Sequence, residues 1–230
     1  MPLRIELRGL LDTIFPPRCA GCGLRGVDLC AHCISTIRPP DPDSCPRCGR
    51  PSRLGGLCKA CQGYDGPLSG IRTACIYDGV ARNAIHSLKY RHRRTLALPL
   101  ATLLAAELTR RPLQLHLLVP VPLHPRRLAE RGFNQSELLA RDLGKRLGIP
   151  VATCLERRRE TKAQAGLKAT ARWANVRGAF GCVDQSSLHG KRIGVVDDVC
   201  TTGATLEECA RVLHEAGCSA VWGIAVARDL

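Results

Sequence analysis

Aromatic side chains are scarce in this chain of 230 residues, where Phe, Trp and Tyr together make up 3%. Proteins that bind single strands without sequence preference stack successive bases on aromatic rings, and this chain has little material for such a surface. It also has no apolar run long enough to span a membrane as a helix. Its apolar content of 45% is still sufficient for a packed core, which predicts an ordinary globular fold.

A secretory signal is missing as well, because the N-terminal segment contains Glu6 and Asp12 and no continuous apolar stretch. The apolar residues from Leu3 to Ile14 fall on one helical face, which we expect to pack on the body of the protein. A helix that lies on a membrane surface is the alternative. We therefore expect a cytoplasmic protein, in which the 14 cysteines are thiols or metal ligands rather than disulfides.

Acidic residues are scarce in the middle of the chain. Residues 70–180 carry 21 basic and seven acidic side chains, a net charge of +14, whereas residues 181–230 carry a net charge of −3. Such an excess favours a polyanionic ligand or a nucleic acid as a partner. A solvated, arginine-rich surface without a binding role is the alternative, and it remains open.

Eight of the 14 cysteines fall in four Cys-x-x-Cys pairs, which are Cys19 and Cys22, Cys30 and Cys33, Cys45 and Cys48, and Cys58 and Cys61. Each pair can present two thiolates to one tetrahedral ion, and two pairs complete a Cys₄ zinc site. The spacing therefore predicts two closed, structural zinc sites, with redox disulfides or an iron–sulfur centre as weaker alternatives. Pairing along the sequence and a cross-braced pairing of alternate pairs both remain open.

A domain boundary is expected where glycine and proline cluster between Gly63 and Gly70. Residues 1–66 are too few and too polar for a core of their own, so metal binding must supply much of their folding free energy. Residues 67–230 are long enough for a second domain, in which apolar strands alternate with helical patterns.

The stretch IGVVDDVCTTGAT, residues 193–205, is the most informative part of the chain. Its apolar run predicts a buried parallel strand that ends in Asp197 and Asp198, and a helical pattern follows. Ligands of open α/β sheets bind at this end of a strand, and free backbone N–H groups at the helix start bind phosphate. Paired acids suit sugar hydroxyls or Mg²⁺ instead. The alternative is that the acids only end a strand and Thr202 only caps a helix.

A second buried strand, residues 115–121, ends in alternating prolines and is followed by Arg126, Arg127 and Arg131. Proline cannot continue a sheet, so we expect an extended, basic loop at the same edge as the acids. Ser136 is then expected to cap a helix. Further on, the sequence predicts a strand at 151–155, a polar surface loop at 157–167 and a helix at 170–176 that carries Arg172.

Residues 195–205 resemble the loop of type I phosphoribosyltransferases that binds 5-phosphoribosyl 1-pyrophosphate (PRPP). The resemblance implies that Asp197 and Asp198 hold the ribose hydroxyls of PRPP, together with Mg²⁺, and act in catalysis. The following loop is implied to hold the 5′-phosphate through Thr201, Thr202, Gly203, Ala204 and Thr205. The loop with Val121 and Arg131 is implied to hold pyrophosphate.

A narrower resemblance begins at residues 131–135, Arg-Gly-Phe-Asn-Gln. Together with the cysteine pairs and the acid loop, this motif is similar to the ComF (GntX-like) family over nearly the whole chain. That family joins an N-terminal double zinc ribbon to a type I phosphoribosyltransferase-like α/β domain with a parallel-sheet core. By position, the polar loop resembles a catalytic lid in which Lys162 faces pyrophosphate. The family's link to natural competence implies single-stranded DNA and DNA-uptake proteins as partners.

Three functions are compatible with these features. The first is an active phosphoribosyltransferase on an unknown acceptor. The second is a non-catalytic protein that senses PRPP or a nucleotide and handles single-stranded DNA. The third is a zinc-ribbon adaptor with a vestigial PRPP loop, and the intact Asp197, Asp198 and threonines count against it.

Overall fold

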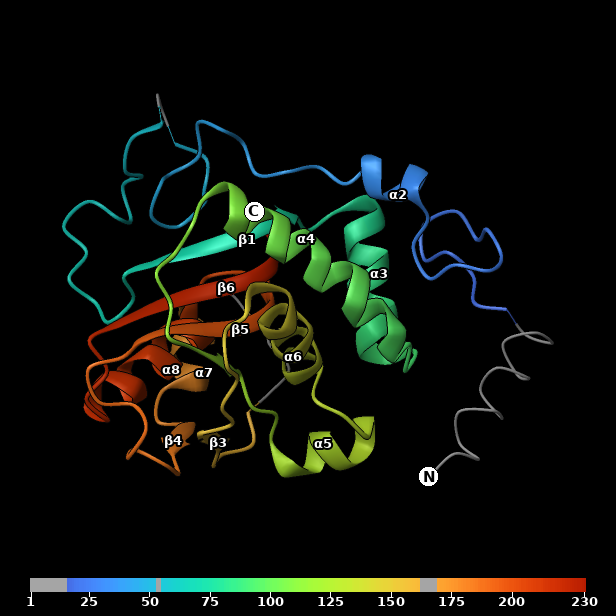
Figure 1. Ribbon diagram of the computed structural model, residues 1–230. Coiled ribbons are helices and arrows are strands. Elements are labelled where there is room, and N and C mark those ends of the chain that lie inside the picture. Colours follow the sequence, from blue (N-terminus) through green and yellow to red (C-terminus); the bar gives the residue numbers. More distant parts are fainter. Residues whose placement is uncertain (1–15, 53–54, 162–168) are drawn as a thin grey trace.

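The computed structural model describes residues 16–52, 55–161 and 169–230. In these residues a cysteine-rich segment with little regular structure precedes an α/β core (Figure 1). The helices and strands, in chain order, are α2 (Ala31–Ser35), β1 (Gly70–Ile76), α3 (Gly79–Tyr90), the 3₁₀ helix η2 (Arg94–Leu96), α4 (Ala97–Arg110), β2 (Leu117–Pro120), α5 (Pro125–Arg131), α6 (Gln135–Leu147), β3 (Leu155–Arg157), α7 (Ala169–Val176), β4 (Phe180–Cys182), β5 (Arg192–Cys200), α8 (Ala204–Glu215) and β6 (Ala220–Arg228). Within the described ranges, no helix combines the length and the apolar character needed to cross a membrane. The helix expected between Leu3 and Ile14 lies outside the described residues.

Four parallel strands form the main sheet, in the order β1-β6-β5-β2. Val195 pairs with Val119 on β2 and with Gly223 on β6, so β5 lies inside the sheet. Parallel strands are covered on both faces, which is why their sequences are nearly continuous apolar runs rather than alternating patterns. The carboxyl ends of all four strands meet at one edge, and this is the edge to which β5 brings the acid pair.

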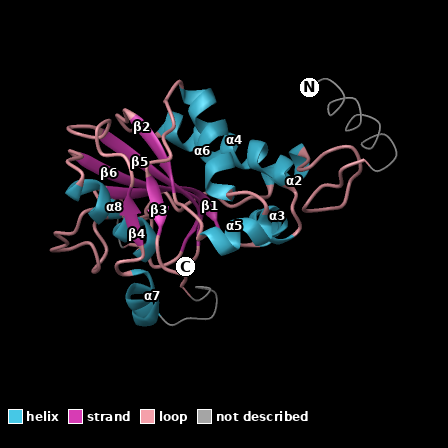
Figure 2. Cartoon of the chain, turned by 90° about the horizontal axis from the view of Figure 1, so that it is seen from below, coloured by secondary structure: helices cyan, strands magenta, loops and turns pink. Residues whose placement is uncertain are grey.

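Helices cover both faces of the sheet (Figure 2). On one face α3, α4 and α6 pack around Ile85, Leu100 and Leu139, which are fully buried. On the other face α7, α8 and the antiparallel strand pair β3-β4 lie around Leu206 and Leu213. Truncation of any one of these leucines to Ala would cost about 2–5 kcal/mol of stability. The predicted parallel-sheet α/β core is therefore confirmed.

The loop after β2 differs from its prediction. An extended loop was expected, but residues 125–131 form helix α5. Pro125 stands at the start of this helix, where its missing N–H leaves no hydrogen bond unmade, and Gly132 ends the helix with φ of 70°. The basic side chains of this segment are thus held on a short rigid helix.

Two other local predictions are wrong. Asn134, not Ser136, caps α6, because its side chain accepts a hydrogen bond from the backbone N–H of Ser136 at 3.0 Å. The expected strand at 151–155 is displaced along the chain to β3, and Val151 makes only an isolated bridge to Leu118. The first of these corrections matters for the site, since it frees the Ser136 hydroxyl.

Strand β5 runs further than predicted. Asp197 pairs with Ala225 and Cys200 pairs with Arg228, so the acids lie within the strand rather than at its end. Successive residues of a strand project to opposite faces, and the two acids therefore meet different neighbours. Only three residues, 201–203, remain between the strand and α8.

Candidate functional site

A cavity of about 230 Å³ opens at the carboxyl edge of the sheet, and we call it the acid cavity. Segments α3, α6, β5, α8 and the loop after β2 all contribute to its lining. Its charged lining residues are five cations and three acids: Lys89, Arg127, Arg131, Arg157, Arg172, Asp197, Asp198 and Asp229. The resulting formal charge of +2 favours an anionic ligand.

Asp198 lines this cavity and is 3% exposed. Its Oδ1 atom lies 2.6 Å from Nζ of Lys89, near the end of α3. Burial acts to lower the pKa of Lys89, but the charges of Asp198 and Asp197 outweigh burial and raise it. The second oxygen of Asp198, Oδ2, is buried and has no hydrogen-bond partner among the described residues. Buried polar atoms are normally paired, so this oxygen is available to a ligand of the cavity.

Asp197 has different partners. Its Oδ1 accepts hydrogen bonds from Oγ of Ser136 at 3.1 Å and from the backbone N–H of Asp198 at 2.8 Å. Burial, followed by the charge of Asp198, raises the pKa of Asp197 to about 7, although Lys89 acts in the opposite direction. The carboxyl group therefore changes its charge near neutral pH, and a cation bound beside it would favour the ionised form.

The loop after β5 and the first turn of α8 carry functional groups on two sides. Thr201 and Thr205 line the acid cavity, whereas Thr202 and Gly203 line a separate cavity. Gly203 has φ of 92°, in the left-handed region that glycine adopts without strain, and the loop can turn there into α8. The Thr202 hydroxyl accepts a hydrogen bond from the N–H of Ala204 at 3.3 Å. The other N–H groups at the start of α8, together with the hydroxyls of Thr201 and Thr205, form an arrangement that suits a phosphate.

Val121 and Arg131, predicted to contact pyrophosphate, both line the acid cavity. Val121 extends the pairing with β5 by donating its N–H to the carbonyl oxygen of Val196 at 2.9 Å. Arg131 ends α5, where its guanidinium lies 5.6 Å from the centroid of the Tyr90 ring and bonds the side chain of Gln135. The loop after β2 therefore reaches the same space as the acids.

The remaining predicted cations divide into two groups. Arg127 and Arg172 line the acid cavity, whereas Arg126 forms ion pairs with acidic side chains outside its lining. Arg157 also lines the cavity, and its Nε is buried without a partner among the described residues. Burial, followed by the charge of Arg127, lowers the pKa of Arg157. Lys162 lies outside the described residues.

Sequence reasoning did not identify Lys89 as the partner of Asp198 or Ser136 as the partner of Asp197. A lysine at the basic end of a helix has the same pattern whether it is solvated or paired. The serine was assigned to the helix cap. Only the packing of α3 and α6 against β5 brings these side chains to the acids.

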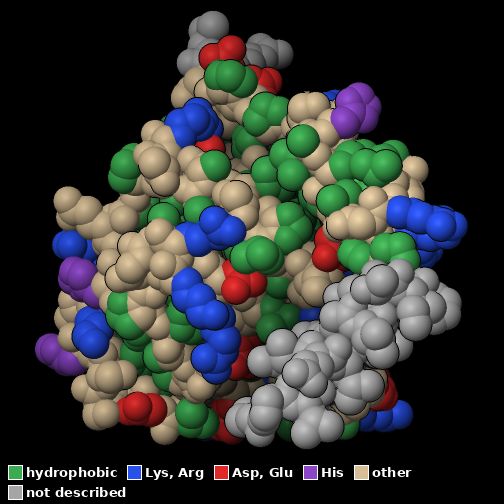
Figure 3. Space-filling model, turned by 45° about the vertical axis from the view of Figure 1, so that its right-hand side comes forward, with side chains coloured by type: hydrophobic (Ala, Val, Ile, Leu, Met, Phe, Trp, Pro, Cys, Tyr) green, Lys and Arg blue, Asp and Glu red, His purple; other side chains and the backbone are tan. Residues whose placement is uncertain are grey.

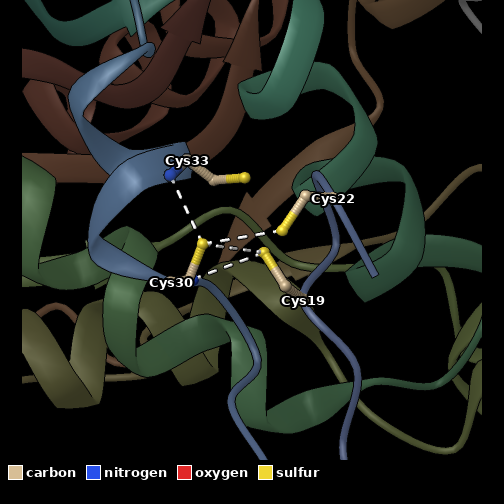
Figure 4. Close-up of side chains that lie close together, drawn as sticks. All are labelled: Cys19, Cys22, Cys30 and Cys33. Carbon is tan, nitrogen blue, oxygen red and sulfur yellow. Dashed lines mark hydrogen bonds between the residues drawn. The ribbon is translucent and has the colours of Figure 1, made fainter. Parts of the chain in front are cut away.

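The eight paired cysteines gather in two clusters, in each of which the four sulfur atoms lie within 4.8 Å of one another. The clusters follow the sequence, with Cys19, Cys22, Cys30 and Cys33 in the first (Figure 4) and Cys45, Cys48, Cys58 and Cys61 in the second. In the first cluster Sγ of Cys30 lies 3.7 Å from Sγ of both Cys19 and Cys22. Sulfurs around a tetrahedral zinc, with Zn–S bonds of about 2.3 Å, lie about 3.8 Å apart. Both donor sets therefore fit structural zinc.

Backbone groups prepare the first cluster for a metal ion. The N–H of Cys33 points to Sγ of Cys30 and the N–H of Cys30 points to Sγ of Cys19, each at 3.4 Å. Burial acts to raise the pKa of Cys19, but hydrogen bonds from nearby N–H groups, that of Cys22 foremost, lower it to about 6. A Cβ atom at Gly21 would lie 2.5 Å from Sγ of Cys33, so only glycine leaves room for the sulfur.

Basic side chains on the face shown in Figure 3 are spread over several places, with hydrophobic side chains between them. They do not gather in one area among the residues coloured there. Five cations converge instead on the acid cavity. Part of the positive charge of the middle segment is thus directed at a small site.

Two family models match the chain: a double zinc ribbon domain over residues 10–62 and a phosphoribosyl transferase domain over residues 134–229. The chain is similar to the DNA utilization protein YhgH of Escherichia coli (strain K12), with 35% identity over 84% of this chain and 87% of that protein. It is also similar to competence protein F of Haemophilus influenzae, with 31% identity over 96% of this chain and 95% of that protein. Among solved structures, the glutamine PRPP amidotransferase from B. subtilis matches with a TM-score of 0.41 and 21% identity, over 61% of this chain and 30% of that one.

Proposed function

The chain belongs to the ComF family of competence and DNA utilization proteins, and from this premise we propose that its acid cavity binds PRPP with Mg²⁺ for phosphoribosyl transfer. The observation that carries the proposal is the convergence of Asp197, Asp198 and the threonine loop with five cations in one cavity. In this proposal residues 1–66 form the zinc-binding domain and residues 67–230 form the transferase-like domain.

The donor set fits a magnesium ion. Mg²⁺ prefers oxygen ligands, and Oδ2 of Asp198 is a buried oxygen that lacks a partner among the described residues. Asp197 stands beside it with a carboxyl group that ionises near neutral pH. The two acids would hold the ribose hydroxyls and the ion, which supplies positive charge to the pyrophosphate.

The protein's own groups would then position PRPP and stabilise the departing pyrophosphate. Thr201, Thr205 and the N–H groups at the start of α8 hold the 5′-phosphate. Arg131, Arg127 and Arg157 face the pyrophosphate, whose negative charge grows as its bond to C1′ of the ribose breaks. The acceptor forms the new bond to C1′, so catalysis rests on orientation and charge stabilisation rather than on a protein nucleophile.

Handling of single-stranded DNA is a second proposed function. The specific observation in its favour is the net charge of +14 on residues 70–180, in a chain whose relatives are named for competence and DNA utilization. We propose the cytoplasm as its compartment, because none of the 14 cysteines forms a disulfide bond. A labelled oligonucleotide should bind at low salt, and its affinity should fall steeply as salt rises. Absence of any shift at low salt would remove this function.

Calorimetric titration with Mg-PRPP tests the acid cavity. Asp197→Asn and Asp198→Asn should each weaken binding by about 100-fold, because each removes a charge-assisted contact worth about 1.5–3 kcal/mol. Asp142→Asn, an acid on α6 outside the cavity lining, is the matched control and should bind as the wild type does. Unchanged affinity in both acid variants would show that PRPP does not bind here.

Pyrophosphate release decides whether binding leads to transfer. Wild-type protein with Mg-PRPP should release pyrophosphate in the presence of one member of a panel of bases, nucleosides and oligonucleotides. Release that disappears in Asp197→Asn assigns the reaction to the acid cavity. Tight binding without release from any acceptor favours the non-catalytic, PRPP-sensing function.

A further inference from the structure

A second cavity, of about 310 Å³, lies between the second cysteine cluster and the start of α8, and we call it the ribbon cavity. Its volume falls in the range of small-molecule sites, about 300–1,000 Å³. Cys48 and Cys61 line it from one side, and Thr202, Gly203 and Glu207 line it from the other. Among the described residues it shares no lining residue with the acid cavity, so the loop after β5 separates the two.

The walls of the ribbon cavity hold two of the chain's eight aromatic residues, Tyr64 and Trp173, beside Leu68 and Ile71. Trp173 is 43% exposed, although a large aromatic side chain stabilises a protein most when it is buried. The guanidinium of Arg47 lies 3.7 Å from the centroid of the Tyr64 ring, and it is held by the carbonyl oxygens of Tyr64 and Leu68. These flat surfaces are suited to a planar aromatic ligand.

Hydrogen-bond donors and acceptors also line this cavity. Arg228 is 1% exposed, its Nη1 donates to Sγ of Cys200 at 2.8 Å, and its Nε has no partner in the described part of the chain. A thiol is a weak acceptor, so among the described residues neither Nη1 nor Nε of this buried guanidinium has a strong one. Glu207 supplies a carboxylate, which accepts a hydrogen bond from the hydroxyl of Tyr64. A ligand that offers an acceptor to Arg228 and N–H donors to Glu207 would satisfy the hydrogen-bonding capacity of both side chains.

Charge balance narrows the ligand class. Arg47, Arg50 and Arg228 bring three positive charges to the cavity and Glu207 brings one negative charge. A zinc ion held by four thiolates in the adjacent cluster carries a net charge of about −2. The surroundings are therefore nearly neutral, which gives little attraction to a phosphate and favours an uncharged, polar ring.

We propose that the ribbon cavity is a second ligand site, for an uncharged nucleobase whose edge carries adjacent N–H donors and a carbonyl acceptor, as guanine does. The ring stacks beside Trp173, its N–H groups donate to Glu207, and its carbonyl oxygen accepts from Arg228. This site and the acids Asp197 and Asp198 lie on opposite sides of the loop after β5, so the site differs from the position of a transfer acceptor. It does not depend on PRPP being the ligand of the acid cavity.

Tryptophan fluorescence of the zinc-loaded full chain, titrated with guanosine, tests the site. Stacking should quench the emission saturably. Trp173→Phe should lose the quench, because the other tryptophan, Trp222, packs against Arg72 at 4.7 Å. Saturating PRPP should leave guanosine bound. A quench that persists in Trp173→Phe, or competitive displacement of guanosine by PRPP as from a shared site, would overturn the proposal.

Glu207→Gln tests base selectivity. It keeps an acceptor for Tyr64 but loses the charge, and guanosine affinity should fall about tenfold while adenosine, which lacks the paired N–H donors, changes little. Glu215→Gln, at the exposed end of the same helix, is the control and should bind as the wild type does. Equal affinities in Glu207→Gln and wild type would overturn the assignment.

The source of the base is decided by parallel titrations with guanosine and with short single strands of dG or dT. Quenching by guanosine identifies a free base or nucleoside as the ligand. Quenching by the dG strand alone identifies a base within DNA, and either result supports the site. No saturable quenching by any of these probes would show that the cavity binds no base.

Discussion

Nζ of Lys89 lies 2.6 Å from Oδ1 of Asp198, and this ion pair ties the last turn of α3 to the acid pair on β5. The side chains are 19% and 4% exposed, so water screens the pair only weakly. Lys89 compensates the charge of the more deeply buried acid, while Asp197 keeps a proton up to a pH near 7. The site can therefore hold two adjacent carboxyl groups before any cation binds.

Replacement of Lys89 by Met should lower the free energy of unfolding by about 3 kcal/mol, because removal of one partner leaves the other charge buried and unpaired. Urea unfolding followed by circular dichroism measures the change. Lys145→Met, at an exposed position on α6, should cost less than about 0.5 kcal/mol. The double variant Lys89→Met with Asp198→Asn should recover part of the loss. A Lys89→Met protein as stable as the wild type would show that the pair is not formed.

Affinity for Mg-PRPP should rise between about pH 6 and pH 8. Asp197 must be ionised to bind the cation, and its pKa is raised to about 7, so affinity should increase up to about tenfold per pH unit below that value. Calorimetry over a pH series measures the profile. Asp197→Asn should bind weakly throughout the range, and a flat wild-type profile would contradict the role of Asp197.

The unliganded protein should show the opposite trend. An acid whose pKa is higher in the folded than in the unfolded state stabilises the fold while it is protonated. The contribution of Asp197 is therefore complete below about pH 4 and is lost as pH rises through its folded pKa of about 7. Unfolding experiments over this range should show a smaller decline in Asp197→Asn than in the wild type.

The purified chain should contain two zinc ions. Cys19→Ser should contain one, because a Cys₄ site that loses a thiolate binds zinc far more weakly. Cys182→Ser, outside both clusters, should still contain two. A chromogenic chelator added to denatured protein counts the ions. One ion in the wild type would contradict the presence of two sites.

Arg50→Met should weaken Mg-PRPP binding about tenfold without loss of zinc. Arg50 lies between Cys48 and Cys58 of the second cluster, and its Nη2 donates to the carbonyl oxygen of Thr202 at 3.2 Å, which braces the loop after β5. A hydrogen bond from a charged group contributes about 1.5 kcal/mol or more. Arg82→Met, an exposed position on α3, is the control. Full affinity in Arg50→Met would show that the loop holds its shape without the ribbon.

Features that are local in the sequence could be predicted, because their chemistry is set by spacing. The four cysteine pairs and the run from Val195 to Thr205 are of this kind. The pairing of Lys89 with Asp198 could not be predicted, since more than a hundred positions separate them and only the packing of α3 on the sheet joins them. Helix α5 was missed although Pro125 and Gly132 signalled it, because the prolines before it favoured an extended loop. The ribbon cavity depends on residues from four distant segments.

The short loop after β5 and the first turn of α8 form a wall of both cavities, with Thr201 and Thr205 on one side and Thr202 and Gly203 on the other. Any shift of its backbone reaches both spaces at once. Linkage then requires symmetry: the factor by which a base changes the affinity for PRPP equals the factor by which PRPP changes the affinity for the base. The affinity of the chain for PRPP would then depend on the concentration of free base, and its affinity for the base on the concentration of PRPP. The three residues between β5 and α8 would carry this coupling.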